Sequence, residues 1–222
     1  MPYKRAIRDD VFVTSIWRKK ITNVSTLNEA IMKELESEDA QNSHKNIYGG
    51  QEVRLKAGPG IKLLLDCAES LAKEISDFLN VAEGDNPRVT CFWGNINYEK
   101  EFNPPHVHPG SDLSGIYYVQ IPENKITNDD QSSTAGCVCF HDPKLQKTMS
   151  SPLHKEELAY LELNEYSQPK SFPRRNAWLD NIVKYKPEEG LMLMWPSWLM
   201  HYVEPNLSEQ ARVGISFNIK LT

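Results

Sequence analysis

The chain has 222 residues, 40% of them hydrophobic and 25% charged, and a formal net charge of −5. This composition is ordinary for a globular protein and large enough for a substantial core. The acidic balance, without a long block of lysine or arginine, argues against broad binding of nucleic acids or acidic membranes. No apolar run approaches the roughly 20 residues that span a bilayer, and the N-terminus lacks a signal-peptide pattern. Four cysteines inside apolar runs favour free thiols, so we expect a cytoplasmic protein.

The N-terminal third predicts two helices. Residues 10–17 alternate between apolar and polar and predict an opening strand. Thr26 and Glu29 have the spacing of a capping box and predict a helix start. The polar, glycine-bearing stretch 41–59 predicts a loop. Helical spacing predicts an amphipathic helix over 61–79, with its apolar face formed by Leu64, Ala68, Leu71, Ile75 and Phe78.

From residue 88 onward the pattern is mostly β. Strands are predicted at 89–93, 113–121, 135–140, 182–185, 191–195 and 213–221, with a loop at 94–105. The long polar stretch 144–180, with a strand-like patch at 159–163, is a candidate lid or recognition loop. Helices followed by strands predict an α+β fold. We expect one domain, with helical support over about 1–85 and a β core over about 86–222.

Three of the six histidines suggest a metal site. His106 and His108 lie two residues apart just before the strand 113–121, and side chains two apart on an extended segment point the same way. Two neutral imidazoles that converge form half of a site for a first-row transition metal. His201, in WPSWLMHYVEP, is the candidate for the other half. The remaining histidines are interpreted as ordinary surface or core residues: His44, His141 and His154.

The last predicted strand carries an arginine among apolar residues, and Arg212, Gly214 and Ser216 alternate on one of its faces. An arginine that points into the interior must be paired, and no acidic residue in that strand is spaced to pair with it. A ligand carboxylate would satisfy the guanidinium, and so would a protein salt bridge. Tyr118 and Ser114, four apart on their own strand, share a face and would add hydroxyl donors.

The motifs HVHP, SGIYY, FHDP, PSWLMHYVEPN and RVGISFN follow one another in the chain. In this order they resemble the catalytic half of the Fe(II)/2-oxoglutarate-dependent oxygenases, in the prolyl-hydroxylase-like branch. Within it they resemble a small group of 2OG-Fe(II) oxygenases known chiefly from marine bacteria and phages. The resemblance covers about residues 88–222. It implies a double-stranded β-helix (jelly roll) and a hydroxylase that uses Fe(II), 2-oxoglutarate and O₂ on an unidentified substrate.

By this resemblance His106 and His201 are iron ligands. The superfamily has an aspartate or glutamate two residues after the first histidine, where this chain has His108. Three alternatives follow: His108 as third ligand, Asp112 swinging in from the next turn, or water or an anion in that position. His108 is favoured, because its i, i+2 spacing places it where the carboxylate would be.

The resemblance also assigns Arg212 to the far carboxylate of 2-oxoglutarate. The other residues expected to contact the cosubstrate are Tyr118, Ser114, Ser216 and Asn95. Trp93 and Asn97 are expected to contact the substrate, and a purely structural role in the core is the alternative for Trp93.

Two rival functions remain at this point. One is a jelly-roll binding protein without catalysis, and the other is a cupin-type three-histidine metalloenzyme that does not use 2-oxoglutarate. Arg212 with Tyr118 discriminates, because only the oxygenase needs a dicarboxylate anchor. A homodimer through the N-terminal helices is a further expectation.

Overall fold

The computed structural model describes residues 13–45, 50–81, 86–122, 136–144 and 182–221. Two helices are present, α1 (Ser25–Asn42) and α2 (Pro59–Phe78). The strands are β1 (Trp17–Lys20), β2 (Ser43–Lys45), β3 (Gln51–Arg54), β4 (Arg88–Asn97), β5 (Asn103–His106), β6 (Leu113–Gln120), β7 (Val138–His141), β8 (Ile182–Tyr185), β9 (Leu191–Pro196), β10 (His201–Val203) and β11 (Arg212–Lys220).

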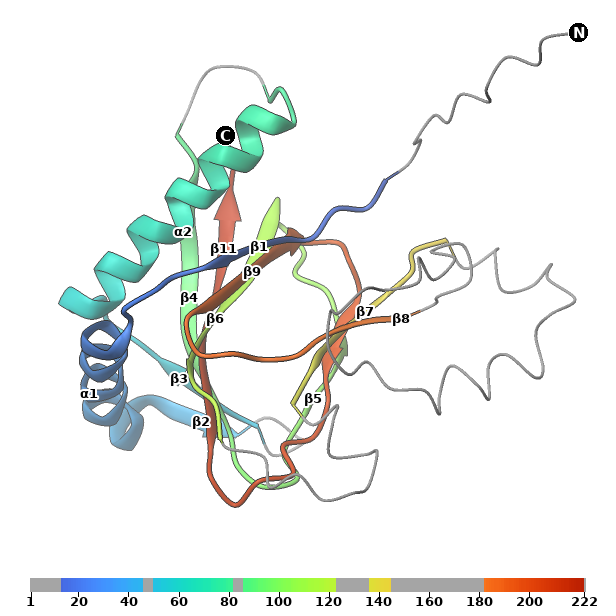
Figure 1. Ribbon diagram of the computed structural model, residues 1–222. Helices are drawn as coiled ribbons and strands as arrows, with labels where there is room; N and C mark the ends of the chain where they lie inside the picture. Colours follow the sequence, from blue (N-terminus) through green and yellow to red (C-terminus); the bar gives the residue numbers. More distant parts are fainter. Residues whose placement is uncertain (1–12, 46–49, 82–85, 123–135, 145–181, 222) are drawn as a thin grey trace, which may run out of the picture.

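The strands form two antiparallel sheets (Figure 1). The larger has the order β1-β9-β6-β11-β4-β3-β2, and the smaller has the order β5-β10-β7-β8. Apolar side chains of both sheets form a common core between them: Ile116, Tyr118, Leu193 and Trp195 from the larger sheet, and Val138, Phe140 and Val203 from the smaller. This two-sheet arrangement agrees with the predicted jelly roll, and the space between the sheets contains the candidate site.

Both helices lie against the outer face of the larger sheet (Figure 1). Successive side chains of a strand point to opposite faces, so Tyr117 packs in the core beneath the helices while Tyr118 packs between the sheets. Asn28 of α1 is buried and fixes that helix to β6. Its Oδ1 accepts a hydrogen bond from the Tyr117 hydroxyl at 2.7 Å, and its Nδ2 donates to the Val119 carbonyl at 2.7 Å. The helices therefore support the sheet from the side away from the site.

Two predicted boundaries near the N-terminus are wrong. The first described strand starts at Trp17, where the predicted strand 10–17 ends, because pairing with β9 selects residues 17–20. The first helix starts at Ser25, because the Val24 carbonyl accepts the first helical hydrogen bond, from Asn28 N–H at 2.8 Å. Thr26 therefore lies inside the first turn and is not its cap.

Other errors concern strand partners and one aromatic residue. The predicted loop 41–59 contains the end of α1 and the strands β2 and β3, and the predicted loop 94–105 contains the end of β4 and most of β5. Polar residues form strands there because neighbouring strands pair with them.

Phe78 ends α2 with its side chain 71% exposed, so it is not part of the buried helix face. The candidate lid, apart from Lys144, lies outside the described residues.

The glycine of the SGIYY motif is required by close packing. A Cβ at Gly115 would lie 2.7 Å from the Leu193 carbonyl oxygen and would overlap the Phe217 ring. We expect Gly115→Ala to lower the free energy of unfolding by about 1–3 kcal/mol, because the surrounding strands must move apart. Urea denaturation measures this, with Leu63→Ala on the exposed side of α2 as a control. An unchanged urea midpoint would mean that the neighbouring strands accommodate the added methyl group without cost.

Neither helix in the described part of the chain is long and apolar enough to cross a membrane. All four cysteines lie within the described residues and are free thiols, as predicted. Cys137 and Cys139 are buried and Cys67 is partly buried, but Cys91 is exposed, although it also lies in an apolar run. The homodimer stays a prediction.

Candidate metal and cosubstrate site

Three imidazoles converge between the sheets. His106 ends β5 and is paired in register with His201, the first residue of β10. His108 follows β5, and its backbone N–H donates to the Ser197 carbonyl at 2.9 Å, which ties it to the turn before His201. One nitrogen from each ring lies within 4.8 Å of the others. The ring centroids of His106 and His201 are 4.3 Å apart, and Nε2 of His108 is 3.3 Å from Nε2 of His201.

Backbone carbonyls fix the orientation of two of these rings. Nδ1 of His106 lies 2.7 Å from the Pro104 carbonyl oxygen, and Nδ1 of His201 lies 2.8 Å from that of Leu199. A carbonyl only accepts, so each Nδ1 carries the proton and each Nε2 has a free lone pair. Metal-bound histidines have this arrangement. The Nε2 atoms of these two rings are therefore free to bind a metal ion.

Burial keeps two of the rings neutral. The pKa of His201 is lowered to about 3 and that of His108 to about 4, by burial first and by the charge of His106 second. Neutral imidazole is the form that binds a metal. The apo cluster is thus ready to accept a cation at neutral pH.

These shifts predict that the metal-free protein loses stability in mild acid. An unfolded histidine has a pKa of about 6.5, so below that pH the unfolded chain binds protons that the folded chain refuses at His108 and His201. Stability is unaffected above pH 6.5 and falls from there toward pH 4, by up to about 1.4 kcal/mol per pH unit for each ring. Thermal unfolding of chelator-treated protein between pH 7.5 and 4.5 measures this. His201→Ala should flatten the slope, and the same slope in that variant would assign the acid sensitivity to other groups.

Asp112 points away from the imidazoles. Its Oδ1 lies 3.1 Å from the Lys220 ammonium, and its Oδ2 accepts from Leu221 N–H at 2.9 Å. Both carboxylate oxygens are thus engaged at the C-terminal end of β11. Trp93, in contrast, stacks on His108 with a centroid separation of 5.7 Å, so it forms a wall of the imidazole cluster.

Arg212 lies deep between the same sheets, with 3% of its surface exposed. One terminal nitrogen donates to the Gly136 carbonyl at 2.8 Å, and the other donates to Oδ1 of Asn97. Within the described residues no carboxylate pairs with it. Burial lowers its pKa, and a guanidinium buried without a counter-ion is expensive unless a ligand supplies one.

Tyr118 belongs to the same region as Arg212. Burial raises the pKa of the Tyr118 phenol, and the charge of Arg212 is the largest opposing influence. The phenol is fully buried, yet its oxygen has no hydrogen-bond partner among the described residues. Buried hydroxyls rarely lack a partner. A free phenol close to an uncompensated guanidinium is suited to a carboxylate.

The other predicted cosubstrate residues divide into two groups. Asn95 donates to the Ser216 hydroxyl at 2.5 Å, on the neighbouring strands β4 and β11. Ser114 is not brought to Arg212. Its hydroxyl donates to Oδ1 of Asn218 at 2.8 Å, and Asn218 lies six residues after Arg212 on β11, about 20 Å along the strand. Ser114 and Tyr118 share a face of β6, but only Tyr118 lies at the level of Arg212 along the strands.

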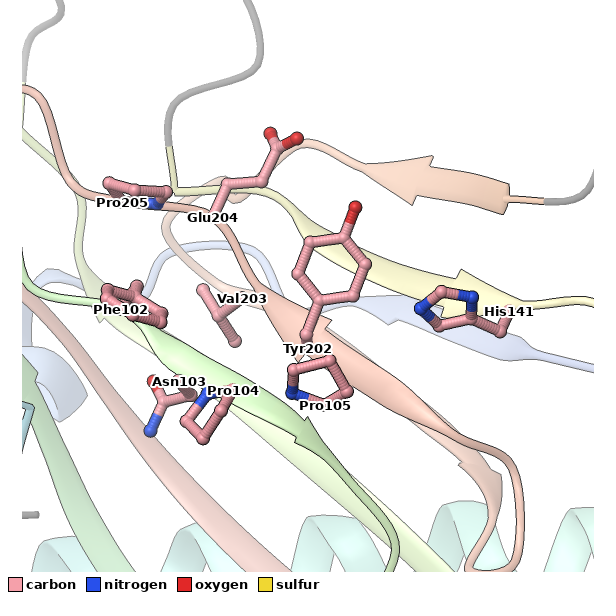
Figure 2. Close-up of a pocket in the computed structure, with 9 residues that line it drawn as sticks. All are labelled: Phe102, Asn103, Pro104, Pro105, His141, Tyr202, Val203, Glu204 and Pro205. Atoms are coloured by element: carbon pink, nitrogen blue, oxygen red, sulfur yellow. The ribbon is translucent and has the colours of Figure 1, made fainter. Parts of the chain in front are cut away.

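A cavity of about 400 Å³ lies elsewhere on the molecule (Figure 2). Tyr202 in its wall lies between the buried residues His201 and Val203 on β10, so its side chain points to the opposite, outer face of the smaller sheet. His141 also lines this cavity, with its ring centroid 5.4 Å from that of Tyr202. It is not part of the imidazole cluster, as predicted, whereas His154 and the side chain of His44 lie outside the described residues.

A protein family described as "Putative 2OG-Fe(II) oxygenase" matches residues 91–218. The match spans more than half of the chain, from Trp93 through the three histidines to Arg212. The chain belongs to this family. It is a 2-oxoglutarate-dependent oxygenase, with Fe(II) as its metal and 2-oxoglutarate and O₂ as its cosubstrates.

Solved structures of oxygenases resemble the whole chain. A Pseudomonas putida prolyl-4-hydroxylase shares 12% identity at a TM-score of 0.58, covering 94% of both chains. HygX from Streptomyces hygroscopicus, with nickel and 2-oxoglutarate bound, shares 16% at 0.57, covering 94% of this chain and 84% of that one. A Trichoplax adhaerens prolyl hydroxylase with a hypoxia-inducible-factor peptide shares 14% at 0.56, covering 93% and 83%. These likenesses confirm the double-stranded β-helix. No curated protein matches the sequence.

Sequence reasoning on this oxygenase missed several contributors to the site. The Pro104 and Leu199 carbonyls that orient the imidazoles are backbone atoms, which no side-chain pattern discloses. Trp195, for which the sequence indicated no role in the site, has its ring centroid 4.8 Å from that of His201. Its buried Nε1 has no acceptor among the described residues. Asn97, for which the sequence predicts a substrate contact, also accepts a hydrogen bond from Arg212.

Proposed function

We propose that His106, His108 and His201 hold the iron of this oxygenase and that Arg212 and Tyr118 bind the far carboxylate of 2-oxoglutarate. The overall reaction is hydroxylation: substrate C–H, 2-oxoglutarate and O₂ give substrate C–OH, succinate and CO₂. The observation that carries the proposal is the convergence of three imidazole nitrogens within 4.8 Å of one another, with two of the rings oriented by carbonyls.

For the third ligand the contacts favour His108 over Asp112. Two ligand atoms at right angles, each about 2.1 Å from a metal, are roughly 3 Å apart. The 3.3 Å between Nε2 of His108 and of His201 is close to that spacing. Asp112 would first have to leave Lys220 and the Leu221 N–H. Three neutral imidazoles fit an Fe(II) ion without a protein carboxylate.

The anchor fits 2-oxoglutarate through charge and hydrogen bonds. The far carboxylate supplies the anion that buried Arg212 lacks and the acceptor that the Tyr118 hydroxyl lacks. Asn95 and Ser216 are proposed to contact the cosubstrate between the anchor and the metal. Ser114 is not retained in this role, because its hydroxyl is committed to Asn218.

When bound, the iron would activate O₂, which is the oxidant, and 2-oxoglutarate would supply two of the four electrons that O₂ takes up and leave as succinate and CO₂. The chain's own residues would hold the metal and orient the cosubstrate. The carbonyls of Pro104 and Leu199 keep two imidazoles in the tautomer that can bind metal. Trp93, stacked on His108, is proposed to cover one side of the site, to exclude water and to contact the substrate. Arg212 fixes which end of the cosubstrate faces the metal.

The rival functions are less well supported. A cupin-type three-histidine enzyme that does not use 2-oxoglutarate has no need of a buried guanidinium without an acid or of a free phenol beside it. A binding protein without catalysis has no need of oriented, neutral imidazoles. A cytoplasmic location is proposed from the four free thiols.

Succinate formation tests the proposed function. Wild-type protein supplied with Fe(II), O₂, 2-oxoglutarate and ascorbate, which supplies the two electrons that the unidentified substrate would otherwise give, should release succinate, and chelation of the metal should stop the release. The matched control is His141→Ala, which removes an imidazole outside the cluster and should keep the activity. A wild type that forms no more succinate than His201→Ala would contradict the proposal.

A further inference from the structure

All described protein partners of the Arg212 guanidinium are electrically neutral. They are the Gly136 carbonyl and the amide oxygen of Asn97, and the nearby Tyr118 phenol is protonated because burial raises its pKa. The guanidinium is therefore fixed in direction by hydrogen bonds while its charge stays uncompensated. A carboxylate in place of the Asn97 amide would have almost the same shape but would cancel that charge.

Asn97 is itself held firmly. It is 1% exposed, at the end of β4, paired in register with Arg212. Its Nδ2 donates to Oδ1 of Asn103 at 3.3 Å, and its backbone carbonyl accepts from Nδ2 of Asn206 at 2.9 Å. Because Nδ2 is directed to Asn103, Oδ1 must face Arg212. Asn103 begins β5, the strand that ends with the proposed iron ligand His106, so this contact links Arg212 to that strand.

We propose that Asn97 is a positioning residue for cosubstrate binding: it aims the Arg212 guanidinium and, being neutral, leaves its charge for the far carboxylate of 2-oxoglutarate. This inference rests on the proposed function. It assigns Asn97 a role through Arg212 instead of the substrate contact predicted from the sequence. The choice of an amide over a carboxylate at this position is then a determinant of cosubstrate affinity.

Two substitutions separate positioning from plain structural support. Asn97→Asp keeps the size and the hydrogen bond from Arg212, which it turns into an ion pair, and loses the donation to Asn103; Asn97→Ala removes both hydrogen bonds without adding charge. If Asn97 only supported the fold, the aspartate would be the milder change, because a buried guanidinium is stabilised by a counter-ion. If Asn97 keeps Arg212 available, the aspartate is the more harmful change for ligand binding, because it competes with the ligand's carboxylate.

The experiment is calorimetric titration of the full chain, loaded with Ni(II) as a redox-inactive metal, with two ligands. One is 2-oxoglutarate, and the other is 2-oxobutanoate, which has the same chelating end but no far carboxylate. We expect Asn97→Asp to weaken 2-oxoglutarate binding on the order of 100-fold and Asn97→Ala on the order of 10-fold. Binding of 2-oxobutanoate should change less than about twofold in both, since it does not reach Arg212. The thermal midpoint of Asn97→Asp should equal or exceed that of Asn97→Ala.

Two results would overturn the inference. The first is 2-oxoglutarate binding by Asn97→Asp that equals or exceeds that of Asn97→Ala. The second is an equal loss of both ligands, which would place the effect at the metal. Failure of the proposed function is separately visible, because the wild type would then show no preference for 2-oxoglutarate over 2-oxobutanoate.

Discussion

Replacing His201 with alanine should reduce Fe(II) affinity by well over 100-fold. Residues that merely orient a metal ligand typically contribute 10- to 100-fold, and His201 is proposed as a ligand itself. It is the most buried of the three imidazoles, at 3% exposure, and pairs directly with His106. Anaerobic competition against a chromophoric chelator measures the affinity. The cavity left by the ring should lower stability only modestly, so circular dichroism at 20 °C should report a folded variant.

His141→Ala is the matched control for this loss. His141 lies on the outer cavity beside Tyr202 (Figure 2), and its removal should leave Fe(II) affinity unchanged. His108→Ala should lose affinity about as strongly as His201→Ala, while Asp112→Ala should keep it. The reverse pattern, with Asp112→Ala losing iron and His108→Ala keeping it, would show that the third iron ligand is the Asp112 carboxylate and not His108.

Arg212→Ala should weaken 2-oxoglutarate binding by roughly 100- to 1,000-fold and leave Fe(II) affinity intact. Removal of one partner of a buried, charge-assisted pair typically costs about 2–5 kcal/mol. The guanidinium belongs to β11, whereas the three imidazoles belong to β5, β10 and the segment after β5, so the two functions should separate. Titration of 2-oxoglutarate into the Ni(II)-loaded variant provides the dissociation constant.

Arg88→Ala, at the exposed start of the paired strand β4, is the control for loss of a positive charge and should bind 2-oxoglutarate as the wild type does. Parallel loss of metal and cosubstrate in Arg212→Ala would show that Arg212 holds the sheets together and has no specific ligand.

The imidazole cluster could be predicted because short sequence patterns around each histidine indicate it. His106 and His108 are related by strand periodicity, and His201 is embedded in a motif with its own signature. Arg212 could be predicted because an arginine in an otherwise apolar, buried strand needs a partner for its charge. The strands that carry these residues could be placed within a few positions, since each has a dense apolar pattern.

The sequence could not predict which residues of different strands lie side by side. Ser114 and Tyr118 share a face, yet pairing with β11 places Ser114 beside Asn218 and Tyr118 opposite Gly214. Only the register between strands far apart in sequence decides which of them meets Arg212. Pairing also determined the polar strands β2 and β3, whose own residues indicated a loop. Asn97 and Arg212 are 115 residues apart in the sequence, and the residues around neither one indicate that they are in contact.

The central claim is that three imidazoles and one guanidinium form a single pocket for Fe(II) and 2-oxoglutarate. Anaerobic titration of 2-oxoglutarate into the Fe(II)-loaded wild type, followed by visible absorption, tests it most directly. The expected result is a charge-transfer band that saturates at one 2-oxoglutarate per iron, vanishes in His201→Ala and needs far more 2-oxoglutarate in Arg212→Ala. Absence of the band in the wild type at millimolar 2-oxoglutarate would contradict the account.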